Sequence, residues 1–311
     1  MQIPLLKFLP VSGALNQRGA ARRIAYWDWP CQAGADNPHV VIAVHGLTRQ
    51  SRDFDVLAQA LTPQARVLAV DVAGRGDSDW LADPALYQLP TYVADLAQLI
   101  EYLRAQNPGV VIDWVGTSMG GLIGLTLASQ PAIGLRRLVL NDVGPVIQRP
   151  AMQRIAGYVG RHMCFDDELT AFEHMAQIFA GFGPHAPTQW AALCRPMLRL
   201  RNGRYCLHYD PAIGEPLRAW VTLTDEDAGW QILRQSEALL WAAYDAIACP
   251  TLLLRGADSD LLSRETADQM RQRGPHATCL AFPAVGHAPT LVADDQVQAV
   301  RQFLWREPAI A

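Results

Sequence analysis

The chain has 311 residues, of which 50% are apolar and 18% charged, and its formal net charge at pH 7 is -4. This composition excludes intrinsic disorder and provides no basic field that would attract nucleic acid. No uninterrupted apolar run reaches about 18 residues, so we expect no membrane-spanning helix and no membrane partner. The six cysteines lie at long, irregular intervals without a C-x-x-C pair, which predicts reduced thiols in a cytoplasmic protein.

Short apolar runs alternate with helical periodicity from Val40 to Asn141, the pattern of a parallel sheet with crossover helices. The run from His39 to His45 is apolar on both faces and is followed by Gly46, as expected of a buried strand. Two earlier segments predict an antiparallel edge. The strands expected up to this point comprise residues 5–10, 22–29, 39–45, 66–71, 110–115 and 135–140, and the helices comprise residues 51–62, 91–105 and 119–129.

The pattern changes after the sixth of these strands. Residues 146–245 lose β-runs almost entirely and carry apolar helical segments, and alternation resumes after Pro250 with strands 251–255 and 277–282 and helices 263–273 and 294–305. An insertion of this length usually forms a lid. We therefore expect an α/β core domain at residues 1–145 and 246–311, with a mostly parallel eight-stranded sheet, helices on both faces, and a helical cap at residues 146–245.

The sequence Gly116-Thr117-Ser118-Met119-Gly120 lies between a predicted strand and a predicted helix, which is the context of a nucleophile elbow. Such a turn strains the backbone of the serine, and the two glycines remove side chains that would collide with neighbouring backbone. The turn lifts the Ser118 hydroxyl above the strand ends and aims the helix N-terminus at developing negative charge. Ser118 is the predicted nucleophile.

His287 is the predicted general base. It follows the last strand and is the one histidine of eight that has glycine before it and Ala-Pro after it at a strand exit. His45 is a formal competitor, but its place before Gly46-Leu47 better suits support of a loop. In that loop the backbone amide of Leu47, together with that of Met119, would stabilise the tetrahedral intermediate.

These residues resemble the α/β-hydrolase superfamily over nearly the whole chain. The resemblance is carried by His45-Gly46, by the loop Asp71-Val-Ala-Gly-Arg-Gly-Asp-Ser78, by the elbow at Ser118 and by Gly286-His287, in the order of the family. It implies a serine nucleophile, a histidine base and a cap between the sixth and seventh strands. Because epoxide hydrolases and haloalkane dehalogenases of this fold need an aspartate where Ser118 stands, the resemblance excludes both.

The acid of the triad stays open between three aspartates. Family members usually place it three residues after the glycine that ends the seventh strand, but counting from Gly256 gives Ser259, with Asp258 and Asp260 on either side. Asp142 ends the sixth strand, and some members of the superfamily draw the acid from there. We favour Asp142 over Asp260, and Asp260 over Asp258; a losing aspartate would cap a turn or helix.

Two further residues are candidates for substrate binding. Arg49 follows the oxyanion loop and could pair with a substrate carboxylate, and His45 lies in the loop itself. The cap histidines show no metal-binding spacing, so we expect no metal and no cofactor. The large apolar residues of the cap are expected to form mostly its own core, with a minority lining the pocket: Met163, Phe165, Phe172, Met175, Phe179, Trp190 and Met197.

The pattern as a whole predicts a carboxylesterase-like serine hydrolase that cleaves a small ester, lactone, amide or activated C–C bond through an acyl-enzyme. Alternatives on the same site are a cofactor-free haloperoxidase and an acyltransferase. A hydrolase-fold receptor without efficient turnover is an alternative from another class. We expect a small-molecule substrate, no nucleic-acid or membrane partner, and a monomer or homodimer.

Overall fold

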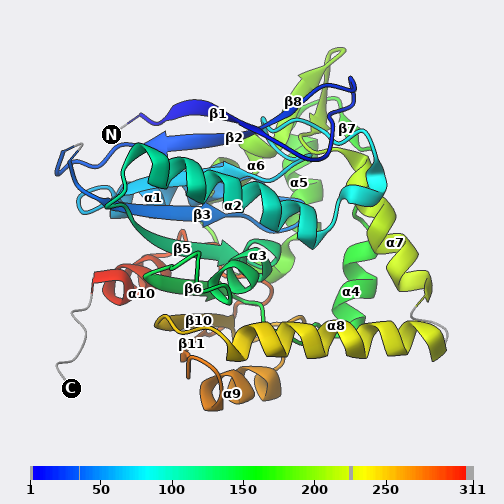
Figure 1. The fold of residues 1–311 in the computed structure, drawn as a ribbon. Coiled ribbons are helices and arrows are strands. Elements are labelled where there is room, and N and C mark those ends of the chain that lie inside the picture. Colours follow the sequence, from blue (N-terminus) through cyan, green and yellow to red (C-terminus); the bar gives the residue numbers. More distant parts are fainter. Residues whose placement is uncertain (1–2, 35, 224–226, 306–311) are drawn as a thin grey trace.

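The computed structural model describes residues 3–34, 36–223 and 227–305, and an eight-stranded sheet lies at its centre (Figure 1). The strand order is β1-β2-β4-β3-β5-β6-β10-β11. β2 pairs antiparallel with β1 and β4, and the pairs from β4 to β11 are parallel, so the predicted antiparallel edge and parallel sheet are confirmed. The strands are β1 (Leu5–Val11), β2 (Arg22–Trp29), β3 (His39–Val44), β4 (Arg66–Asp71), β5 (Val111–Thr117), β6 (Arg137–Asn141), β10 (Thr251–Gly256) and β11 (Thr278–Phe282).

Helices cover both faces of this sheet because its central strands are apolar on both sides. On one face α1 (Asp55–Leu61) and α10 (Asp294–Trp305) contribute to one buried apolar cluster. On the other face α2 (Leu89–Gln106), α3 (Met119–Ala128) and α9 (Arg264–Gln272) contribute to a second, larger cluster. The sheet is therefore the middle layer of three.

The chain between β6 and β10 forms an inserted segment, which we define as residues 149–245 without the undescribed residues 224–226. It contains helices, as expected, but also a small sheet of order β7-β9-β8, which corrects the expectation that β-runs are almost absent. The signal for its hairpin is Asn202-Gly203, which joins β8 to β9 with both residues at positive φ, as a tight hairpin turn requires. The elements are α4 (Arg149–Ala156), β7 (Cys164–Phe165), α5 (Glu168–Ile178), α6 (Pro187–Cys194), β8 (Leu198–Arg201), β9 (Arg204–Leu207), α7 (Gly214–Leu223) and α8 (Asp227–Asp245).

Two cysteines of the inserted segment form a disulfide, Cys164–Cys206. They face each other across the antiparallel pair β7 and β9, which brings their Cα atoms to 4.0 Å. The expectation that all six cysteines are free thiols is therefore wrong for these two. The spacing of the cysteines in the sequence did not indicate this disulfide, because the two residues meet only through the pairing of β7 with β9, which was not predicted.

Helix α8 is one long helix that leads from the inserted segment toward β10 (Figure 1). Near its C-terminal end Tyr244 is fully buried, and its hydroxyl donates to the carbonyl of Met270 in α9 at 2.6 Å. The last turns of α8 thus pack with the sheet helices although the expected domain boundary falls after them. Neither α8 nor any other helix in the described ranges has the length and apolar character needed to cross a membrane.

A buried ion pair ties β2 to α2. The Arg22 and Asp95 side chains are each 1% exposed, and Arg22 Nη1 donates to Asp95 Oδ2 at 2.6 Å. Replacing Asp95 with alanine leaves an unpaired buried guanidinium and is expected to lower the free energy of unfolding by about 3–5 kcal/mol. Chemical denaturation measures the loss. The exposed pair Arg271–Asp268 is the control, since Asp268→Ala is expected to change stability by no more than about 0.5 kcal/mol.

Candidate active site

Ser118 occupies the sharp turn between β5 and α3. Its φ of 52° and ψ of -116° are unusual for a residue with a side chain. A Cβ at Gly116 would lie 2.2 Å from the carbonyl oxygen of Gly120, and one at Gly120 would lie 2.0 Å from that of Val44. Glycine at both positions is therefore a condition of the turn.

A line of hydrogen bonds runs from Ser118 through His287 to Asp142. Nε2 of His287 lies 2.9 Å from the Ser118 hydroxyl, and Nδ1 lies 2.8 Å from Asp142 Oδ2. Because a carboxylate can only accept, Nδ1 carries the hydrogen and Nε2 is left to accept from the serine. The Asp142 side chain is fully buried and the His287 side chain is 12% exposed. This is the arrangement that makes a serine nucleophilic.

The two other candidate acids lie elsewhere. Asp260 is exposed and forms a two-bond ion pair with Arg154, with its oxygens 2.7 and 2.9 Å from the guanidinium nitrogens. Asp258 is exposed as well, and its backbone amide donates to the carbonyl of Val285. In this structure only Asp142, of these three aspartates, lies within hydrogen-bond distance of His287.

Three residues for which no role was predicted support this arrangement. Ser259, at the position where the family usually has its acid, donates its hydroxyl to Asp142 Oδ2 at 2.6 Å, and the amide of Gly256 donates to Oδ1 at 3.0 Å. The side-chain amide of Asn141 donates to Thr117 beside Ser118 and to the carbonyl of Pro289. The sequence contained a signal for Ser259, because this residue stands three positions after Gly256, where the family usually has its acid.

Leu47 and Met119, whose backbone amides are the expected oxyanion donors, line the same cavity as Ser118. Within the described residues, neither amide donates to a protein acceptor. The carbonyl of Gly46 belongs to the same peptide unit as the Leu47 amide, and it accepts from His45 Nδ1 at 2.7 Å and from the Arg49 amide at 3.1 Å. Because a trans peptide points its N–H opposite to its C=O, these bonds turn the Leu47 amide away from His45.

His45 itself is fully buried, and burial lowers its pKa to about 3. The Val72 amide donates to its Nε2 at 3.0 Å, which leaves Nδ1 as the donor to Gly46. Both ring nitrogens are thus engaged with backbone in a neutral imidazole. These contacts correct the expectation that His45 binds substrate and agree with the alternative role in loop support.

Two arginines lie behind the same loop. Arg75 is fully buried and donates to the carbonyls of Leu47 and Ala73 and to the Tyr92 hydroxyl. Arg49 is 5% exposed; it pairs with Asp53, donates to the carbonyl of Leu193 in α6 and lies over the ring of Phe179. Since its charge is already paired, Arg49 is not available to a substrate carboxylate, which corrects that expectation.

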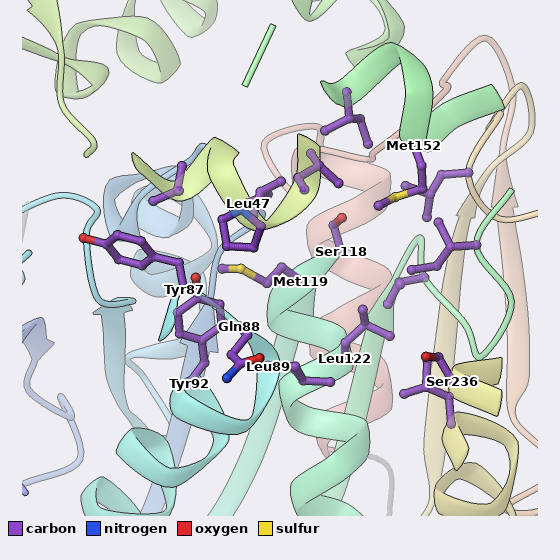
Figure 2. A pocket seen from close by; sticks show the side chains of 18 of the residues that line it. Leu47, Tyr87, Gln88, Leu89, Tyr92, Ser118, Met119, Leu122, Met152 and Ser236 are labelled. Atoms are coloured by element: carbon purple, nitrogen blue, oxygen red, sulfur yellow. The ribbon is translucent and has the colours of Figure 1, made fainter. Parts of the chain in front are cut away.

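The cavity beside Ser118 has a volume of about 350 Å³ and is lined almost entirely by apolar side chains. Figure 2 shows Ser118 and Met119 at the start of α3, with Gln88 and Tyr92 from the region of α2 and Ser236 from α8. The apolar cap residues named from sequence do not line it within the described chain; most of them form a separate cluster inside the inserted segment. The inserted segment instead contributes Met152, Ile155, Ile213, Pro216, Leu217, Ser236, Glu237 and Leu240.

Hydrogen bonds join the inserted segment to two loops beside this site. At the loop after β4, the Asp210 amide donates to the Gly74 carbonyl at 2.7 Å, and the Tyr87 hydroxyl donates to the Asp210 carboxylate at 2.6 Å. At the loop of His287, the Gly286 amide donates to the Gly181 carbonyl at 2.6 Å. Together with the bond from Arg49 to the carbonyl of Leu193, these bonds hold the inserted segment against the core beside Ser118.

Comparison with known proteins gives three related results. The chain is 42% identical over 285 residues to a 3-hydroxybutyrate-oligomer hydrolase of Cupriavidus necator. The alignment covers 90% of this chain and 92% of that protein. It is 27% identical to a pimeloyl-[acyl-carrier protein] methyl ester esterase of Nitrosomonas europaea, over 82% and 91% of the two chains. The crystal structure of an α/β hydrolase from Novosphingobium aromaticivorans superposes with a TM-score of 0.77 at 33% identity, over 98% and 99% of the chains.

The family described as serine aminopeptidase, S33, matches residues 35–290, which is most of the chain. The eight-stranded sheet, the elbow and these relatives agree on the fold and on hydrolase activity. The chain is therefore an α/β-hydrolase enzyme and belongs to the serine aminopeptidase S33 family.

Proposed function

We propose that this enzyme is a serine esterase that hydrolyses short oligomers of 3-hydroxybutyrate. The proposed chemistry rests on one observation, the hydrogen-bonded line Ser118–His287–Asp142 beside an apolar cavity that Ser118 helps to line. The substrate class rests on the 42% identical relative, whose name states that activity. Such oligomers carry one methyl group per unit along an ester chain, and an apolar cavity suits them.

In the proposed mechanism Ser118 Oγ attacks the ester carbonyl while its proton passes to His287 Nε2. The carbonyl oxygen becomes an oxyanion, which the amides of Leu47 and Met119 stabilise. Collapse of the tetrahedral intermediate breaks the C–O bond, and His287 returns the proton to the leaving alkoxide. Water then attacks the acyl-enzyme, with the same imidazole acting as base and then as acid, and the free acid and Ser118 are regenerated. Asp142 holds Nδ1–H and stabilises the imidazolium.

We further propose that residues 146–245 act as a cap over the core formed by residues 1–145 and 246–311. The cap supplies apolar walls to the cavity, and its bonds at Gly74 and Gly286 hold these walls at a fixed distance from Ser118. Exclusion of water there strengthens the amide contacts with the oxyanion.

The experiment that tests this function combines active-site labelling with product analysis. A fluorophosphonate is expected to label the folded protein once, on Ser118, and linear 3-hydroxybutyrate dimer and trimer are expected to be converted to monomer. Mass spectrometry of the labelled peptide and chromatography of the products provide the two readouts. Absence of labelling in folded protein contradicts the serine mechanism, whereas labelling without cleavage of the oligomers contradicts the substrate class alone.

The same assay separates the alternatives. An acyltransferase would give mixed esters in the presence of an added alcohol, and a haloperoxidase would need peroxide and halide. A receptor would bind oligomer without steady-state turnover. We expect hydrolysis to be the main reaction both with added alcohol and with peroxide and halide. A mixed ester or a halogenated compound as the main product would replace our proposal.

A further inference from the structure

The cavity beside the nucleophile and the general base have different neighbours. Within the described chain, the cavity lining includes Ser118, Leu47 and Met119 but not His287. The backbone of His287 instead lies against the inserted segment, 3.7 Å from the position of a Cβ on Gly181. A leaving-group oxygen must come within hydrogen-bond reach of Nε2 to receive its proton. An ester whose leaving group lies beside His287 can then place its acyl part in the cavity.

The cavity carries charge of one sign only. Among its described lining residues Glu237 is the single carboxylate, and there is no lysine, arginine or histidine. Glu237 lies on α8 next to the exposed Ser236, and Glu237 is itself partly exposed. Partial burial raises its pKa, while Arg234, one turn earlier on the same helix, lowers it. Arg234 is exposed and does not line the cavity.

A 3-hydroxybutyrate oligomer has two different ends, a neutral hydroxyl and a carboxylate. The acyl part released by attack at any internal ester carries the hydroxyl end, and the leaving alcohol carries the carboxylate. A carboxylate inside this cavity would be desolvated against apolar side chains and would face Glu237 without a cation, which is unfavourable on both counts. A hydroxyl could instead donate to the Glu237 carboxylate.

We propose that Glu237 fixes the direction in which the substrate chain binds, with the neutral hydroxyl end in the cavity and the carboxylate end on the side of His287. This inference rests on the proposed serine esterase mechanism, but it extends to any ester, because it concerns the far end of the acyl chain. Glu237 acts here as a specificity residue and takes no part in the reaction at Ser118.

Three p-nitrophenyl esters test the inference independently of the natural substrate. Their acyl chains have equal length and end in a methyl, a hydroxyl or a carboxylate group, while the leaving group is identical. We expect kcat/KM for the carboxylate-ended ester to be at least about tenfold below that for the hydroxyl-ended ester. Glu237→Gln is expected to narrow this ratio, and Glu237→Lys is expected to reverse it.

The matched control is Glu173→Gln, which removes the same charge from an exposed position on α5 outside the cavity lining. It should leave the ratio unchanged. Equal kcat/KM for the three esters in the wild-type enzyme, or an unchanged ratio in both Glu237 variants, overturns the inference. If the wild-type enzyme hydrolysed none of the three esters, that result would instead contradict the esterase function itself.

Blocked trimers of 3-hydroxybutyrate give the second readout. A hemisuccinate on the hydroxyl end adds a carboxylate there, an acetyl group on the same end adds a neutral cap, and a methyl ester neutralises the carboxyl end. We expect the acetylated and methyl-esterified trimers to be cleaved and the hemisuccinate to be cleaved at least about tenfold more slowly. Equal rates for acetyl and hemisuccinyl trimers overturn the binding direction. If no trimer is cleaved while the p-nitrophenyl esters are, the substrate class fails and the role of Glu237 is decided by those esters alone.

Discussion

Replacing Ser118 with alanine is expected to lower kcat for ester hydrolysis by about 10⁴-fold or more, because the change removes the hydroxyl on which the proposed acyl-enzyme forms. The variant keeps the Cβ and the backbone of the turn, so the cavity and the His287–Asp142 bond should persist. Binding of substrate is therefore expected to stay close to that of the wild type. Stopped-flow kinetics measures the first quantity, and calorimetric titration with an uncleaved oligomer measures the second.

Ser129→Ala provides the control on the same segment of chain. Ser129 follows α3 and donates its hydroxyl to the Thr126 carbonyl, away from the cavity. Its replacement should leave kcat within about twofold of the wild type, since it removes one local hydrogen bond. If Ser118→Ala retained a tenth of the wild-type kcat, another nucleophile or an activated water would have to do the chemistry.

The elbow was predictable from sequence because its geometry depends on neighbouring residues. Gly116, Ser118 and Gly120 lie within five positions, and the close approaches that require the glycines involve the turn itself and the adjacent β3. The order of strands and helices was predictable for a similar reason, since burial of a sheet on both faces leaves a periodic trace along the chain.

The acid partner of His287 was harder to identify because it depends on two strands that are distant in sequence. β6 and β10 are neighbours in the sheet, with Asn141 opposite Leu254, so Asp142 and the loop after Gly256 emerge at the same edge. Which aspartate reaches the histidine then depends on the backbone of one residue, Asp142 at a φ of 56°, and on the Ser259 hydroxyl. Neither the backbone conformation of Asp142 nor its bond with Ser259 can be recognised from a local sequence pattern.

The pocket lining could not be chosen from sequence for a related reason. Apolar helical residues of the inserted segment serve either its own cluster or the cavity, and helical spacing is the same in both cases. Met175 lies in the first group and Met152 in the second. The contacts between the segment and the core, among them those at Gly74 and Gly286, decide which helix face turns toward Ser118, and they are not visible in helical spacing.

Asp142→Asn is expected to lower kcat by about 10³- to 10⁴-fold with little change in KM, because an amide can donate to Nδ1 and hold the imidazole in the wrong tautomer. Asp260→Asn removes only an exposed ion pair with Arg154 and should change kcat by no more than about twofold. Both variants replace a carboxylate with an amide of nearly the same volume, so the comparison shows the effect of the same change at two positions. Steady-state kinetics on p-nitrophenyl butyrate measures both.

Ser259→Ala measures the contribution of the hydrogen bond that supports Asp142 separately from that of the Asp142 carboxylate. It removes the donor to Asp142 Oδ2 while the carboxylate remains, so we expect an intermediate loss of about five- to tenfold in kcat. The order of loss should be Asp142→Asn, then Ser259→Ala, then Asp260→Asn. A larger loss in Asp260→Asn than in Asp142→Asn would mean that the loop after β10 moves to bring Asp260 to His287 when substrate binds, and the assignment of the acid would then pass to Asp260.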